Sequence, residues 1–264
     1  PRAERRAAVV RILEQYERRF EDLSQAIAME MGSPIDHARG SQAPCLPWHL
    51  TNFLTAFDQM EWVRPLGPHA PDTMISQHPI GVVGLITPWN WPMNQIALKV
   101  IPALLAGCTC VLKPSEESPL NAMIFAEFCH DAGLPAGVFN LVNGTGLDVG
   151  ARMSSHPDVD MVSFTGSTRA GTAVAAAAAP TVKRVAQELG GKSPNIILPS
   201  ADLAAAVKAG VEACFGNTGQ SCDAPTRMFV PAALHEAALV HAAEAAAAVV
   251  VGDPTETETT MGPL

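Results

Sequence analysis

One cysteine near the end of the chain has the setting of a reactive thiol. Cys222 follows the segment Asn217-Thr218-Gly219-Gln220-Ser221, which contains a glycine typical of a loop. A thiolate is a strong nucleophile, and a backbone amide or nearby dipoles can lower the pKa of a thiol from its usual value of about 8.5. Free cysteines are more often buried and inert, which is the alternative. The Gln-Ser-Cys context, with a glutamate upstream at position 188, favours a nucleophile.

That glutamate is the candidate carboxylate base. Glu188 stands between apolar Val185 and Leu189 at the end of an expected strand, and two glycines follow it. Burial there would raise the pKa of the carboxyl towards neutrality, where it can accept a proton. A glutamate is ordinarily a solvated surface residue, so an exposed carboxylate is the alternative.

An asparagine in a tryptophan-rich loop is the candidate oxyanion donor. Asn90 lies between Trp89 and Trp91, after an expected strand and before an expected helix that starts at Pro92. A side-chain amide beside a backbone N–H can stabilise a developing oxyanion. Such an asparagine often caps a turn instead, but Pro92 at the helix start leaves Asn90 in the loop and free to act.

Common phosphate-binding motifs are absent. The chain has no GxxxxGK[ST], no clean GxGxxG and no GxSxG. Gly144-Thr145-Gly146, followed by Gly150, is an incomplete match to the dinucleotide fingerprint and is equally consistent with an ordinary turn.

Alternation of short apolar runs with helical patterns predicts how these residues are positioned. Such an order is typical of a doubly wound parallel sheet with helices on both faces and ligands at the carboxyl ends of the strands. The expected strands are 82–87, 109–113, 138–142 and 160–164, and the expected helices are 92–106, 118–132 and 146–154. Ser118 and Pro119 have the residue types of an N-cap and a first helical position.

The flanking regions have patterns of their own. Apolar residues from Val9 to Ile27 recur at helical spacing and predict one amphipathic helix that docks on the domain. The proline- and glycine-rich segment 61–79 predicts a hairpin or connector. A second α/β segment follows Gly191, with a strand at 195–198, a helix at 203–215 and a strand at 227–230.

Composition limits the class of protein. The 264 residues are 48% hydrophobic and only 16% charged, with a net charge of −9, which indicates a soluble globular protein whose surface is rich in Ala, Gly, Ser and Pro or faces a partner. The acidic balance argues against nucleic-acid binding, and no apolar run is long enough for a membrane span. Six sparse cysteines favour a reducing cytoplasm, and Cys108-Thr109-Cys110 is interpreted as buried strand because no ligand pair at zinc spacing accompanies it.

Four segments taken together resemble the aldehyde dehydrogenase superfamily, through essentially the whole chain. They are Thr87-Pro88-Trp89-Asn90-Trp91-Pro92, Lys113-Pro114-Ser115-Glu116, Phe164-Thr165-Gly166-Ser167, and Glu188-Leu189-Gly190-Gly191-Lys192-Ser193-Pro194 followed by the segment that ends at Cys222. This family oxidises aldehydes to carboxylic acids with NAD or NADP. A carbonyl carbon must first add a nucleophile before it can release hydride, so the resemblance implies Cys222 as nucleophile, Asn90 as oxyanion donor and Glu188 as the base that cleaves the thioester. Lys99 matches a family position assigned to proton relay, although a surface lysine is nearly as plausible.

The resemblance also implies a cofactor site. Lys113 and Glu116 would contact ribose hydroxyls, and Glu116 would repel a 2′-phosphate, which favours NAD while leaving NADP possible. Gly166 and Ser167 would open the helix that meets the pyrophosphate. The positions that match cofactor contacts are Thr87, Trp89, Lys113, Ser115, Glu116, Gly146, Gly150, Phe164, Gly166, Ser167, Gly171 and Leu189.

The implied organisation is a cofactor domain at 1–60 and 80–190, an oligomerisation hairpin at 61–79 and the first part of a catalytic domain at 191–264. A Glu-[any]-Phe-Gly-Pro segment that the family uses later is outside these residues, so the chain is expected to be about half of an enzyme that forms a homodimer or homotetramer. One departure from the family is Asp223, whose charge would oppose thiolate formation unless Arg227 or a later residue offsets it.

Two other functions remain open. The first is an acylating dehydrogenase that passes the acyl group to CoA, which Glu188 disfavours because such members commonly lack the base. The second is a catalytically incomplete fragment that acts only as a nucleotide-binding or subunit-interaction module.

Overall fold

A five-stranded parallel sheet forms the centre of the computed structural model, which describes residues 1–264. The strand order is β5-β4-β3-β6-β7, so the chain winds outward from β3 in one direction and then in the other. This confirms the predicted doubly wound fold. The strands are β3 (Val82–Ile86), β4 (Thr109–Lys113), β5 (Phe139–Leu141), β6 (Met161–Gly166) and β7 (Arg184–Leu189).

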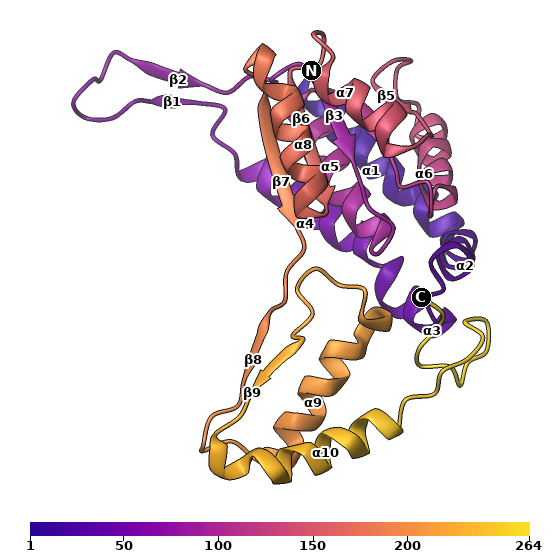
Figure 1. The fold of residues 1–264 in the computed structure, drawn as a ribbon. Coiled ribbons are helices and arrows are strands. Elements are labelled where there is room, and N and C mark those ends of the chain that lie inside the picture. The colour runs from indigo at the N-terminus through magenta and orange to yellow at the C-terminus, as the bar shows by residue number, and fades with distance from the viewer.

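Helices cover both faces of the sheet (Figure 1). The larger hydrophobic core joins one face to α5 (Pro92–Ala106) and α6 (Leu120–Asp131), with α1 (Arg2–Arg18), α2 (Phe20–Met31) and α4 (Cys45–Gln59) packed outside them. A smaller core lies under α7 (Ala151–Ser155) and α8 (Thr168–Ala178) on the other face. Cys108 and Cys110 are buried in the larger core, as predicted.

The predicted single amphipathic helix at the N-terminus is wrong in one respect: it is two helices. Arg19 leaves the helical conformation (φ −126°, ψ 27°) between α1 and α2. Its guanidinium pairs with Asp22 and with Glu127 of α6, so the break turns α2 against α6. The apolar stripe survives because Val9 and Ile27, on opposite sides of the break, are both buried.

Two elements extend from this body (Figure 1). An antiparallel hairpin, β1 (Val63–Pro65) and β2 (Met74–Ser76), projects away from it, as the composition of 61–79 predicts. A second lobe contains the parallel pair β8 (Pro194–Ile196) and β9 (Arg227–Phe229), connected by α9 (Leu203–Phe215) and followed by α10 (His235–Ala247). The predicted helix 203–215 and both predicted strands are therefore present.

Short helical segments connect the main elements. They are α3 (Ile35–His37), the π-helices η1 (Ala38–Gln42) and η2 (Gly146–Gly150), and the 3₁₀-helices η3 (Ala179–Thr181), η4 (Gly216–Gly219) and η5 (Ala232–Leu234). No helix combines the length and hydrophobicity that a membrane span needs.

The last residues of the chain return to the first lobe. The amide of Ile35 donates to the carbonyl of Pro254 at 2.7 Å, and Gly262 crosses directly over Gly32. A side chain on Gly262 would collide with the carbonyl oxygen of Gly32, and Gly32 itself has a left-handed conformation (φ +70°). Both positions therefore require glycine.

The start of α6 is capped by a residue far away in the sequence. The carboxylate of Glu30 in α2 accepts hydrogen bonds from the amides of Leu120 (2.5 Å) and Asn121 (3.3 Å). The predicted cap, Ser118, forms no such bond, and its hydroxyl is buried without a partner. Glu30 is half-buried, and this burial raises its pKa even though the two amides oppose the shift.

Replacement of Glu30 by alanine should destabilise the protein by about 1 kcal/mol, the usual cost of losing a helix cap. Glu30→Gln keeps an acceptor oxygen and relieves the burial of a charge, so it should cost less than half as much. Urea unfolding measures both, with Glu14→Ala on the exposed face of α1 as the matched control. A loss for Glu30→Ala no larger than that for Glu14→Ala would mean that the carboxylate does not act as a cap.

Candidate active site

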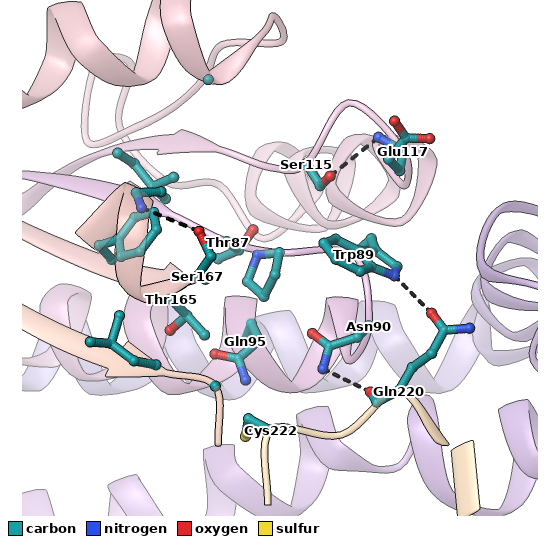
Figure 2. Close-up of a pocket in the computed structure, with 18 of the residues that line it drawn as sticks. Thr87, Trp89, Asn90, Gln95, Ser115, Glu117, Thr165, Ser167, Gln220 and Cys222 are labelled. Carbon is teal, nitrogen blue, oxygen red and sulfur yellow. Dashed lines mark hydrogen bonds between the residues drawn. The ribbon is translucent and has the colours of Figure 1, made fainter. Parts of the chain in front are cut away.

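A cleft of about 600 Å³ opens at the carboxyl ends of the central strands, between the two lobes (Figure 2). Its walls come from the loops after β3 and β4, from the junction of β6 and α8, and from the segments 189–192 and 219–222. Most residues that we predicted to act in catalysis or cofactor binding line it. They are Thr87, Trp89, Asn90, Lys113, Ser115, Glu116, Gly146, Phe164, Gly166, Ser167, Leu189 and Cys222.

Strand topology explains the position of the cleft. β3 and β6 are neighbours in the sheet, but the chain leaves β3 towards α5 on one face and leaves β6 towards α8 on the other. The two connections diverge, and a crevice remains above the strand ends.

The N-terminus of α8 provides an anion-binding end of the cleft. Ser167 is its N-cap, and the Ser167 hydroxyl accepts a hydrogen bond from the amide of Ala170 at 3.2 Å. The other amides of the first turn have no partner within the helix and favour negative charge. We had predicted that Gly166 opens this helix. Instead it is the last residue of β6, where it pairs in register with Leu189 of β7.

An ion pair shapes the opposite wall. The ammonium group of Lys113 donates to the carboxylate of Glu116 at 2.6 Å, with Lys113 almost fully buried and Glu116 about half exposed. This hydrogen bond lowers the pKa of Glu116, which is therefore ionised at neutral pH. A fixed carboxylate at the rim can accept hydrogen bonds from ligand hydroxyls and repels a phosphate.

Three hydrogen bonds attach the loop that carries Cys222 to the loop after β3. The indole of Trp89 donates to the Gln220 side chain, the amide of Asn90 to the Gln220 carbonyl, and the indole of Trp91 to the Ser221 hydroxyl, each at 2.8 Å. Figure 2 shows the first two beside Cys222. Cys222 is exposed in the cleft, so its interpretation as a buried, inert thiol is wrong.

Asn90 lies in the loop before α5, as predicted, but its side chain is already hydrogen-bonded there. The side-chain amide of Asn90 donates a hydrogen bond to the backbone carbonyl of Gln220, and this bond joins the two loops. A side-chain amide has two N–H groups, however, and the second remains available to a ligand.

Glu188 differs most from expectation. Its side chain is exposed and is absent from the cleft walls, since β7 is an edge strand of the sheet and leaves alternate residues open to solvent. The predicted burial is therefore wrong. Glu188 does pair in register with Thr165 of β6, which lines the cleft, and side chains of paired residues point to the same face.

Lys99 lies under the sheet, outside the walls of the cleft. It is only 7% exposed, and its ammonium group donates to the hydroxyl of Ser163 at 3.1 Å. Burial lowers its pKa to about 8, against the opposing effect of the Glu188 charge. The alternative of a surface lysine is therefore wrong.

Two predicted cofactor glycines pack helices instead of lining the cleft. A side chain at Gly171 would collide with Leu189, and the Gly171 carbonyl accepts a hydrogen bond from Gln187 of β7 at 2.6 Å. Gly150 is buried against Ile86 of β3. Both bring a helix close to the sheet.

Arg227 does not offset the charge of Asp223. Its guanidinium donates to the carbonyl of Lys192 at 2.8 Å and lies over the ring of Phe229. No ion pair joins it to Asp223, because that guanidinium is used to hold the β7–β8 connection.

Our sequence reasoning assigned no role to Gln95 and Thr165, two polar residues of the cleft. Both are more than nine-tenths buried, and the Thr165 hydroxyl has no hydrogen-bond partner. Figure 2 shows both side chains on the Cys222 side of the cleft. Gln95 was detectable, since it is polar and lies one helical turn after Trp91 on an apolar helix.

The lowered pKa of Lys99 predicts a stability that depends on pH. The folded chain releases this proton near pH 8 and the unfolded chain near pH 10.5, so between these values the unfolded state binds more protons and stability rises with pH. Relative to Lys99→Met, the wild type should gain about 2 kcal/mol between about pH 7 and pH 9.5. Urea unfolding at several pH values measures this difference. The exposed Lys208, replaced by methionine, should give a difference that does not change with pH.

Comparison with known proteins places these features in context. The profile of the aldehyde dehydrogenase family matches residues 1–264. A 3-succinoylsemialdehyde-pyridine dehydrogenase from a Pseudomonas species is 52% identical over 250 residues, which are 94% of this chain and 52% of that protein.

Solved structures of aldehyde dehydrogenases are also similar to this chain. Aldehyde dehydrogenase from Bartonella henselae superposes with a TM-score of 0.97 at 50% identity, over 100% of this chain and 55% of that one. A cysteine-to-alanine mutant of aldehyde dehydrogenase C from Pseudomonas syringae, in complex with NAD+ and octanal, has a TM-score of 0.95 at 54% identity, over 98% of this chain and 53% of that one. The chain thus spans about half the length of the proteins it matches, and it belongs to the aldehyde dehydrogenase family.

Proposed function

We propose that this chain carries the cofactor site and the nucleophile of an NAD-dependent enzyme that oxidises an aldehyde to a carboxylic acid. The observation that carries the proposal is the attachment of the Cys222 loop to Asn90, through the carbonyl of Gln220, inside one cleft. A nucleophile and an amide donor held together in this way suit addition to a carbonyl group. The relative crystallised with NAD+ and octanal supports the same chemistry.

The residues of the cleft fit NAD. The free amides of α8 beside Ser167 can hold the pyrophosphate, and Glu116 can accept hydrogen bonds from ribose hydroxyls. The buried hydroxyl of Thr165, which has no partner in the protein, offers a hydrogen bond near Cys222. We favour NAD over NADP because an ionised Glu116 repels a 2′-phosphate.

In the proposed reaction, the Cys222 thiolate adds to the carbonyl carbon and forms a thiohemiacetal. The negative oxygen that results is stabilised by the second N–H of Asn90 and by the backbone amide of Cys222. Collapse of this adduct breaks the C–H bond, and the carbonyl re-forms as a thioester on Cys222. Bound NAD supplies the acceptor for the hydrogen and its electron pair.

Water then cleaves the thioester, and Glu188 takes a proton from that water as it attacks. The carboxylic acid forms and the Cys222 thiolate leaves. The register of Glu188 beside Thr165, which lines the cleft, supports this role because the two side chains point to the same face of the sheet. Lys99 lies under the same strands, and with a pKa of about 8 it can pass protons to or from Glu188 at neutral pH.

The proposal also covers assembly and cellular location. The exposed hairpin β1–β2 offers apolar residues such as Val63 and Met74 to a second copy of the protein, as a homodimer or homotetramer requires. All six cysteines are unpaired, which fits a reducing cytoplasm.

The test of this function is the formation of NADH from a panel of aldehydes, which is followed by absorbance. Cys222→Ala should abolish it, whereas Cys214→Ala, on α9, should not. Turnover that survives in Cys222→Ala would remove this thiol from the mechanism. If the chain binds NAD but shows neither turnover nor acylation of Cys222, the result would favour the alternative, a nucleotide-binding or subunit-interaction module.

Glu188→Gln tests the hydrolytic step. Loss of the base should lower the steady-state rate by roughly 10²- to 10⁴-fold, while one equivalent of NADH still forms in a burst. Mass spectrometry should then detect an acyl group on Cys222. Glu212→Gln on α9 is the matched control, and an unchanged steady-state rate in Glu188→Gln would assign the base elsewhere. If CoA and not water relieved the burst in the wild type, the acylating alternative would hold.

A further inference from the structure

A buried glutamine outside the cleft contacts both loops that form the reaction centre. Gln42 is the last residue of η1 and is completely inaccessible to solvent. Its side-chain N–H groups reach the side-chain oxygen of Asn217 at 2.6 Å and the backbone carbonyl of Asn90 at 3.1 Å. Three segments far apart in the sequence therefore meet at one amide.

Asn217 needs this contact because its backbone is in an unfavourable conformation. Asn217 (φ 56°) and Thr218 (φ 57°) are two consecutive left-handed residues, neither of them glycine, five and four positions before Cys222. Such conformations persist only where the surroundings hold them. Both residues are buried, so packing and the side-chain hydrogen bonds of Asn217 do so here.

The orientation of the Asn217 amide follows from Gln42. Since Gln42 donates to the Asn217 oxygen, the Asn217 nitrogen must face the other way. That nitrogen donates to the carbonyl of Asn90 at 2.8 Å and to the carbonyl of Gln220 at 3.1 Å. With the bond from Asn90 to Gln220, the four residues Gln42, Asn90, Asn217 and Gln220 form a closed network, which we call the amide ring.

The amide ring fixes the two groups that the reaction needs. The carbonyl of Gln220, two residues before Cys222, accepts from both Asn90 and Asn217, and the carbonyl of Asn90 accepts from both Gln42 and Asn217. Neither Asn90 nor the Cys222 loop can shift without breaking a bond to Asn217, whose orientation Gln42 sets. None of these contacts involves the Lys113–Glu116 wall or the N-terminus of α8.

We propose that Gln42 is a positioning residue: acting through Asn217, it sets the place of the Cys222 loop relative to Asn90. Its importance for catalysis rests on the function proposed above, but its effect on the loop does not. The oxygen of the Gln42 side chain is buried without a partner, so an apolar residue of similar length removes only the donors of Gln42, which leaves the buried side-chain oxygen of Asn217 without its hydrogen bond.

Gln42→Met is the first test. Amide hydrogen exchange should become at least tenfold faster within residues 216–224 and stay unchanged at 109–116, which distinguishes a loosened loop from a general loss of stability. Turnover should drop by about 100-fold, the effect of a small misplacement of reacting groups, with KM for NAD unchanged. Gln15→Met, at another buried glutamine in α1, is the control and should alter none of these.

Asn217→Gly is the second test, because glycine accepts the left-handed backbone without strain while losing the side-chain bonds. It should speed exchange in 216–224 and lower turnover as Gln42→Met does. In the double variant the two effects should not add, because both remove one network.

These measurements separate the two proposals. Unchanged exchange in 216–224 in Gln42→Met, or fully multiplicative effects in the double variant, would overturn the role of Gln42. Absence of turnover in the wild type, together with the expected change in exchange, would count against the proposed function and still support Gln42 as the residue that positions the loop.

Discussion

The hydrogen bonds between the loop after β3 and the loop before Cys222 are the constraint on which the site depends. The cleft has walls from two lobes, and each lobe has its own strands and its own packing. A thiol on one lobe and an amide on the other keep a fixed separation only if something joins them. Two indole N–H groups and the amides around Gln220 provide that connection, so the site is a property of the junction between the lobes.

The sheet explains why the junction lies where it does. Parallel strands bring all their carboxyl ends to one edge, and the reversal of winding between β3 and β6 opens that edge. The tryptophans that hold the Cys222 loop follow β3 directly, so the residues that join the lobes stand at the same point as those that line the cleft. Fold and site therefore have one geometric origin.

Sequence reasoning succeeded where the signal is local. Apolar runs and helical spacing predicted the strands of the central sheet, the helix 203–215 and the hairpin, because each is encoded within its own residues. It failed where a residue distant in the sequence determines the local structure. Glu30 replaces Ser118 as the cap of α6, and Arg19 breaks a helix to pair with Glu127. Glu188 is exposed because β7 is an edge strand, which depends on the whole strand order. Gln42 lies on a π-helix whose sequence shows no motif at all.

The crossing of Gly262 over Gly32 has a mechanical consequence. The second lobe leaves the first along the connection after β7 and returns to it through residues 248–264, so the two lobes are linked at both ends of the second one (Figure 1). A domain joined by one connection can swing about a single hinge. Here a wide swing would have to bend both connections at once, and the easiest motion left is a small twist about the line that joins them.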